Sequence, residues 1–220
     1  MQNRKIEFTI KNISLYLLGF VVVGFGVVTM LRSQLGAGAW DTVTANLQAL
    51  IGDSFTLGMT SAIISTTIML VVVFYTKKWV LVFMLLPIFF VSTSIDFWDI
   101  TVFREYLPDT IVLKVLFFLS GAICIPFGLA LVVTSKFPAF VFDEFTIMLM
   151  GVFKTENVTR VRFGVEIGGI SLGIMFGFLA GIKFGAVNIG SVIMAILLPP
   201  TFNFFLKVLG AMDETNEVLT

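Results

Sequence analysis

The chain has 220 residues, of which 58% are hydrophobic and 13% charged, with a formal net charge of zero and a mean hydropathy of +1.04. A soluble domain has about 25% charged residues, so this composition excludes an ordinary soluble domain and indicates an integral membrane protein. The neutral charge gives no basic surface for nucleic acid, and the chain has no histidine, the usual metal ligand and general base.

Long apolar runs divide the first half into three predicted spans, each close to the roughly 20 residues that a helix needs to cross a bilayer. These spans are expected over about residues 13–31, 57–75 and 79–97. The third is expected to kink at Pro87. A Gly-Ala-Gly break follows the first span and precedes a segment over about 40–51, which is too short to cross and is therefore interfacial or re-entrant. A polar loop over 96–109 ends this half, and we expect Asp96 and Asp99 in it to be solvated.

The second half repeats this order. Its spans are expected over about residues 110–133, 163–180 and 184–206. The first of them should bend near Pro126 and the last should break at Pro199-Pro200. A second short segment is expected over 142–153, and the acidic tail 211–220 is predicted to be disordered.

Lysine and arginine residues are concentrated in the segments that the six spans place on the same side of the membrane as the N-terminus. The positive-inside rule then places both termini in the cytoplasm. The resulting division is a cytoplasmic N-terminal segment 1–11, repeat one over 12–98, an outer loop 99–109, repeat two over 110–208 and a cytoplasmic tail 209–220. The lipid bilayer is the expected surrounding of both repeats.

The two halves are related in sequence around their breaks. Aligned without gaps, Gly26 falls on Gly128, Ser33 on Ser135, Trp40-Asp41 on Phe142-Asp143, and Thr44 on Thr146. Because each half has an odd number of spans, the second copy would be inverted. The expected fold is thus an all-α membrane protein of six transmembrane helices in two inverted three-helix repeats, each with a short re-entrant or interfacial helix. Secondary transporters often build a midplane site in this way.

Asp41 and Asp143 are the sharpest candidates for a substrate-binding or ion-binding site, because a carboxylate at membrane depth is costly and usually functional. The competing interpretation is that each is only the N-cap of its short helix. The neighbouring Trp40 and Phe142 either line a cavity or act as interfacial anchors, and we favour the anchor.

The backbone breaks carry further candidates. Ser33 and Ser135, just before each break, either coordinate a substrate or bond freed carbonyl groups. Gly36, Gly38 and Pro138 are expected to interrupt the helices.

The fifth span has an acidic residue and a small-residue face. Glu166 is either a proton-coupled group or the partner of Arg162 in a snorkelling pair. Gly169, Gly173, Gly177 and Gly181 recur every fourth residue, which predicts close helix packing. We favour packing inside the fold over a homodimer face.

Several stretches together resemble the YczE/YitT-like bacterial membrane proteins. They are Gly26 to Ser33, Leu35-Gly-Ala-Gly-Ala-Trp-Asp41, Leu47-x-x-Leu50-Ile51-Gly52, Ser54-Phe-Thr-Leu-Gly58, and Ile189-Gly190-Ser191-Val192 to Leu198-Pro199-Pro200. The chain departs from the family pattern at Gly38-Ala39, where Ser-Pro is common, and at Leu198, where glycine is common. The resemblance implies a multi-pass protein of the bacterial cytoplasmic membrane with five or six helices, and Gly36, Trp40 and Asp41 as signature residues. It implies no substrate.

Two functions fit these observations. The first is a transporter for a small solute or ion, with a midplane site between the repeats. The second is a non-transporting capture or accessory subunit of a membrane complex, similar in size to the substrate-capturing subunit of a vitamin importer. An enzyme is the weakest reading, because the sequence shows no metal constellation, nucleophile elbow or acid–base pair. We therefore expect no catalytic residues, no metal and no cofactor.

Overall fold

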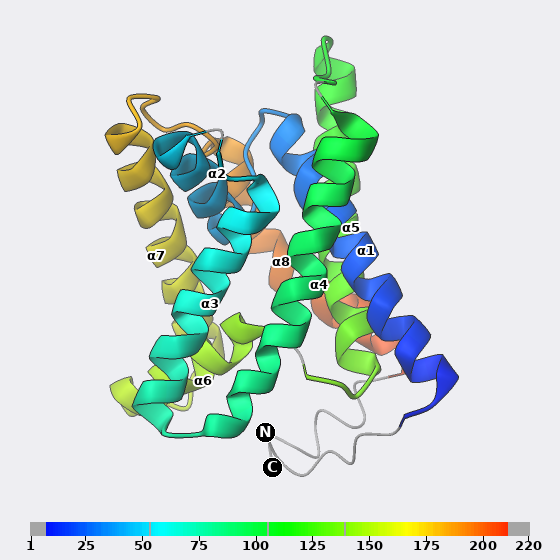
Figure 1. Cartoon of the computed structure of the whole chain (residues 1–220), viewed down its shortest axis with the longest axis vertical. Helices are drawn as coiled ribbons and strands as arrows, with labels where there is room; N and C mark the ends of the chain where they lie inside the picture. Colours follow the sequence, from blue (N-terminus) through cyan, green and yellow to red (C-terminus); the bar gives the residue numbers. More distant parts are fainter. Residues whose placement is uncertain (1–7, 53, 105, 139, 211–220) are drawn as a thin grey trace.

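The computed structural model describes residues 8–52, 54–104, 106–138 and 140–210, and over these residues the protein is helical without strands (Figure 1). Six helical segments of this part are long and apolar enough to cross a membrane. They are α1 (Ile10–Arg32), α3 (Leu57–Thr76), the joined segment Trp79–Phe103, α5 (Ile111–Thr134), α7 (Val158–Leu179) and α8 (Ile189–Val208). The prediction of a six-span integral membrane protein is confirmed. Most of the predicted N-terminal segment and the tail 211–220 lie outside the described residues.

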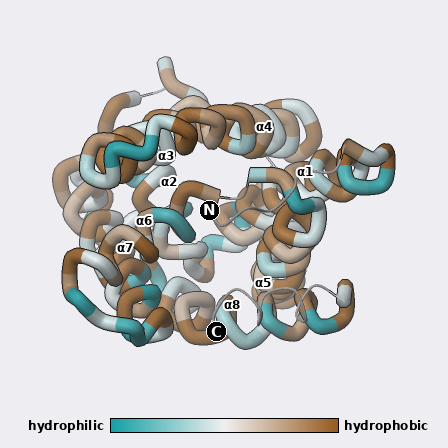
Figure 2. The backbone as a smooth tube through the Cα atoms, turned by 90° about the horizontal axis from the view of Figure 1, so that it is seen from below, coloured by the Kyte–Doolittle hydropathy of each residue, from teal (hydrophilic) through white to brown (hydrophobic). Residues whose placement is uncertain are grey.

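The outer surface of the bundle is apolar, as lipid contact requires. Exposed side chains include Val71 and Phe74 on α3 and Ile196 on α8. Figure 2, a view from one end of the bundle, shows hydrophobic residues predominating around its circumference. In water such exposure would be unfavourable by about 25 cal/mol per Å², so this surface indicates contact with hydrocarbon.

The third span differs from its prediction. It begins with a 3₁₀ turn over Trp79–Met84, continues as α4 (Leu85–Asp96) and ends in a π-helical segment η2 (Phe97–Phe103), so the expected loop begins later. Pro87 lies in the first turn of α4, where a missing amide hydrogen costs little.

Asp96 and Asp99, predicted to be solvated, are paired with other helices. The Gly58 amide and the Thr56 hydroxyl each donate to the Asp96 carboxylate at 2.7 Å, so Asp96 satisfies the start of α3. Asp99 forms an ion pair with Arg32 at 2.6 Å. Both acids thus lie in the helical part of the third span, with Asp96 hydrogen-bonded and Asp99 paired with a cation.

The last two spans also differ from their predictions, which placed their starts at 163 and 184. α7 begins earlier, because the Asn157 side chain accepts from the Arg160 amide and caps the helix. α8 begins later, at a capping box formed by Asn188 and Ser191. The expected break at Pro199-Pro200 is wrong, since α8 runs through both prolines to Val208.

α1 and α5 cross in close contact through glycines. A Cβ added at Gly19 would lie 2.9 Å from the Gly128 carbonyl oxygen, and one at Gly121 would lie 2.6 Å from the Gly26 carbonyl oxygen. Later residues of α1 thus meet earlier residues of α5, so the two helices are antiparallel. This crossing joins the two halves of the chain and lies at one side of the bundle, on the right in Figure 1.

Each short helix packs against a long helix of the other half. α2 (Ala39–Ile51) packs on α7, whereas α6 (Val141–Phe153) packs on α3. Figure 1 shows α2 towards one end of the bundle and α6 towards the other.

A glycine face on α7 receives α2. Added Cβ atoms at Gly169, Gly173 and Gly177 would lie 3.1 Å from Ala39, 2.7 Å from Thr42 and 3.0 Å from Asn46, respectively. Gly181 does not belong to this face. It follows the end of α7 with φ +75°, and nothing lies within 4 Å of its Cβ position, which is the usual place of glycine in a helix-ending turn.

Candidate functional site

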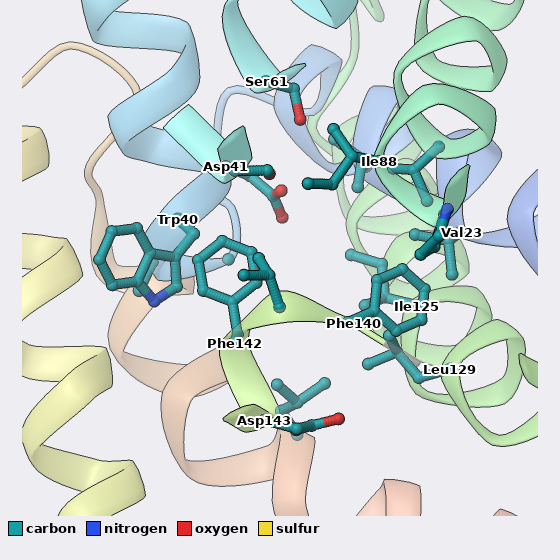
Figure 3. Close-up of a pocket in the computed structure, with 18 of the residues that line it drawn as sticks. Val23, Trp40, Asp41, Ser61, Ile88, Ile125, Leu129, Phe140, Phe142 and Asp143 are labelled. Atoms are coloured by element: carbon teal, nitrogen blue, oxygen red, sulfur yellow. The ribbon is translucent and has the colours of Figure 1, made fainter. Parts of the chain in front are cut away.

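A cavity of about 140 Å³ lies between the two halves, and every α-helix of the described chain contributes to its wall (Figure 3). Most of the wall is aliphatic or aromatic. Its polar side chains are Asp41, Ser61, Ser65, Ser92, Asp143, Arg162 and Glu166. The carboxylates predicted from the two breaks therefore meet at one cavity.

Asp41 and Asp143 hold equivalent positions in their helices. Each is the third residue of a first turn, after the N-cap residues Gly38 and Phe140. The interpretation that they are N-caps is wrong, because both helices begin two residues earlier. A carboxylate in a first turn is still stabilised by the helix dipole. In Figure 3 Asp41 and Asp143 point into opposite ends of the cavity.

The charges of the cavity are unevenly paired. Arg162 donates to the Asp143 carboxylate at 3.2 Å and lies 5.9 Å from the centre of the Phe202 ring. Its partner is thus Asp143 and not Glu166, which sits one turn further along α7. Within the described residues, neither Asp41 nor Glu166 has a hydrogen bond or an ion pair. Arg162 also acts electrostatically on Glu166, so in the described cavity wall one cationic side chain faces three acidic ones, Asp41, Asp143 and Glu166.

Both aspartates lie on the short helices, outside the six spans. Burial, reinforced by the nearby Glu166 carboxylate, raises the pKa of Asp41 to about 7. Burial also raises the pKa of Asp143, although the charge and the hydrogen bond of Arg162 oppose this rise. Asp41 therefore changes its charge close to neutral pH.

The aromatic residues of the two breaks contact each other. The rings of Trp40 and Phe142 have centroids 4.9 Å apart, and Phe145 adds an edge contact to Trp40 at 6.3 Å. Trp40 and Phe142 line the cavity, and Figure 3 shows the Phe142 ring between Asp41 and Asp143. The favoured interpretation of Trp40 and Phe142 as interfacial anchors is therefore wrong.

The serines before the breaks do not line the cavity. Ser33 donates to the Met30 carbonyl oxygen at 2.5 Å and Ser135 to that of Val132 at 2.6 Å, and both serines are fully buried. Their hydroxyl groups bond carbonyl oxygens at the ends of α1 and α5. The interpretation that these serines bond freed carbonyl groups therefore holds, in place of the one that they coordinate a substrate.

The breaks themselves are fastened to distant helices. Gly36 has φ +119°, and a Cβ there would lie 2.5 Å from the Ser191 amide nitrogen at the start of α8. Next to it, the Gly190 amide donates to the Leu35 carbonyl oxygen at 2.8 Å and the Ala37 amide to the Ser191 hydroxyl at 3.1 Å. Pro138, in the second break, accepts a hydrogen bond of 2.9 Å from Tyr16 on α1. Gly38 precedes α2 as its N-cap.

Two cavity residues, Ser61 and Ser65, were not predicted as site residues. Ser61 and Ser65 are four residues apart on α3, so helical spacing alone places them on one face. The same spacing relates Arg162 to Glu166. Within the described residues, no cluster of three or more histidine, cysteine or acidic side chains has metal-site geometry.

The comparisons with known proteins give a family without an assigned activity. The model of a family of unknown function, DUF6198, matches residues 10–207. The chain is similar to an uncharacterized protein of Bacillus subtilis (strain 168), YyaS, with 23% identity over 193 residues that cover 87% of this chain and 94% of that protein. No solved structure matches the chain.

Proposed function

The chain belongs to the DUF6198 family, and on that premise we propose that it transports a small solute or ion through the central cavity. The observation that carries this proposal is that Asp41, from the first half, and Asp143, from the second half, line the same cavity. Two carboxylates at membrane depth are costly unless they serve a pathway. Their placement between two halves matches the site that alternating access requires.

An inverted duplication is part of the proposal, and the α1–α5 crossing supports it. Gly26 lies against Ile125, whose Cγ1 would be 2.8 Å from an added Cβ, and Gly128 lies against Val23, at 2.7 Å. The alignment that equates Gly26 with Gly128 also equates Val23 with Ile125. One contact is therefore converted into the other by exchanging the halves, as a two-fold axis would do.

The breaks give independent support. Each is preceded by a buried serine and then a residue of positive φ, Gln34 at 60° and Lys136 at 63°. Such values are uncommon for residues other than glycine, so two at equivalent positions favour a common origin. We infer further that α2 and α6 are re-entrant from opposite faces. The wider kinship with YczE/YitT-like proteins and the cytoplasmic placement of both termini remain inferences from the sequence.

Flux into proteoliposomes tests the proposal. Purified protein is reconstituted and uptake is followed for a panel of labelled small cations, zwitterions, anions and neutral solutes. We expect one class to enter faster than in protein-free vesicles, and Asp41→Asn and Asp143→Asn each to abolish that excess. The control is Asp109→Asn, an exposed residue outside the cavity. Absence of any excess flux, or equal flux in all three variants, would contradict the proposal.

A further inference from the structure

The charge and wall of the cavity limit what it can accept. Asp143 is already paired with Arg162, so an entering anion would have to displace that pair and would still face Asp41 and Glu166. A cation would instead meet an excess of acidic side chains, because Arg162 is the one cationic side chain of the described cavity wall beside Asp41, Asp143 and Glu166. Like charges placed together are costly in a medium of low dielectric constant, so the cavity favours a positively charged occupant.

The occupant is unlike a hydrated metal ion or a sugar. Ca²⁺ and Mg²⁺ need several oxygen ligands gathered around one point, whereas the acidic side chains of the described residues form no group of three that could hold a metal ion. Apart from the charged side chains and Ser61, Ser65 and Ser92, the wall is valine, isoleucine, leucine, methionine, proline, phenylalanine, tryptophan and small residues. Such a wall fits a hydrocarbon body and leaves the many hydroxyl groups of a sugar without partners.

Two aromatic rings lie beside the carboxylates of the cavity. Trp40 directly precedes Asp41, and its ring contacts that of Phe142 within the wall. The faces of aromatic rings attract ammonium groups, by about 0.5–2 kcal/mol per contact. Rings and carboxylates together are suited to an ammonium group attached to carbon.

Size sets the last limit. An apolar cavity of about 150 Å³ in another protein holds benzene, and the cavity here is about 140 Å³.

From these observations we propose that the substrate is a small organic monocation, an ammonium group joined to a hydrocarbon body about as large as a benzene ring. Asp41 and Glu166 face its charge together with the rings of Trp40 and Phe142, while the aliphatic part of the wall faces its hydrocarbon. This inference rests on the proposed function for its transport meaning, although the binding it predicts can be measured without transport.

Three probes of nearly equal shape test the charge requirement. Equilibrium dialysis of the purified protein in lipid nanodiscs measures binding of labelled benzylammonium, benzyl alcohol and benzoate. We expect saturable binding of benzylammonium, at least about 10-fold tighter than benzyl alcohol, which corresponds to about 1.4 kcal/mol, and no saturable binding of benzoate. Equal or tighter binding of either other probe would overturn the inference.

Variants locate the binding. Asp41→Asn and Glu166→Gln should each weaken benzylammonium binding about 10-fold or more, whereas Glu166→Asp, which keeps the charge, and Asp109→Asn should bind within a few-fold of the parent. Thermal melting of each variant checks that it remains folded, and Asp41→Asn carries the test if Glu166→Gln does not fold. Parental affinity in every neutral variant that folds would refute the assignment.

The flux panel separates the two proposals. Flux of a neutral or anionic solute that needs Asp41 and Asp143 would overturn the substrate class and leave transport standing. Saturable, carboxylate-dependent binding of benzylammonium without flux of any probe would support the class and contradict transport.

Discussion

Alanine substitutions at the α1–α5 crossing test both the packing and the proposed duplication. In Gly26→Ala the new Cβ would lie 2.8 Å from Ile125 Cγ1 and 2.9 Å from the Ile125 amide nitrogen. In Gly128→Ala it would lie 2.7 Å from Val23 Cγ2 and 2.9 Å from the Val23 amide nitrogen. Ordinary contacts are 3.4–4 Å. Because one neighbour is backbone, the helices must move apart to accept the methyl group.

The size of the effect follows from two opposing contributions. Overpacking a close contact costs about 1–3 kcal/mol, while glycine to alanine inside a helix gains about 0.5–1 kcal/mol. Gly168→Ala, on α7, measures the gain from alanine in a helix without the cost of overpacking, because nothing lies within 4 Å of its Cβ position. The free energy of unfolding of Gly26→Ala or Gly128→Ala should therefore fall about 1–3 kcal/mol below that of Gly168→Ala.

Thermal unfolding in detergent measures this difference. One kcal/mol shifts the Tm of a chain of this size by about 2–4 °C, so both crossing variants should melt about 2–12 °C below Gly168→Ala. Gly128→Ala should lose at least as much stability as Gly26→Ala, because its Cβ would also lie 2.7 Å from the Gly19 carbonyl oxygen. A Tm equal to that of Gly168→Ala in both variants would refute the reasoning about the crossing, and a loss in only one of them would count against the duplication.

Three further outcomes are expected. Asn46→Ala removes a buried amide that bonds α7 and the loop after it, so the free energy of unfolding should fall by about 1–3 kcal/mol. Gln48→Ala removes one hydrogen bond from a half-buried side chain to the Phe55 carbonyl oxygen, so it should lose less, about 0.5–1.5 kcal/mol, in the same melts. Asp96→Asn should lower the Tm, because an asparagine side chain has one acceptor oxygen and cannot accept from both the Thr56 hydroxyl and the Gly58 amide. Asp109→Asn should leave the Tm unchanged. Binding of tetramethylammonium, whose charge is independent of pH, should weaken as pH falls through about 7, where Asp41 becomes protonated, and Asp41→Asn should flatten that dependence in equilibrium dialysis. The titratable groups that share the cavity with Asp41 are Asp143, Arg162 and Glu166.

The spans were predictable because length and apolarity are local properties of the sequence. The same holds for the breaks, since Ser33 and Ser135 stop their helices through bonds only three residues away. The local sequence could not predict that Asp41 and Asp143 line one cavity, because helix packing decides it. For the same reason it could not predict that Arg162 pairs with Asp143 rather than with Glu166.

The errors have the same origin. Asp96 and Asp99 are typical of a loop when read alone, but Thr56, Gly58 and Arg32 from other helices satisfy them. The two prolines of α8 indicated a break, yet membrane helices tolerate proline where neighbours satisfy the freed carbonyl groups. Sequence therefore predicts where polar residues are unusual, and only the packed bundle shows which of them find partners.

The fastening of the first break to the start of α8 has a consequence for biosynthesis. The Ala37 amide reaches the Ser191 hydroxyl across 154 residues of chain, and Ala37 is fully buried in the finished protein. Chains generally begin to fold from the N-terminus during synthesis, but the Ala37 amide and the Leu35 carbonyl oxygen gain these partners only after the start of α8 has been made. The first break therefore reaches its final hydrogen bonding late in the assembly of the bundle.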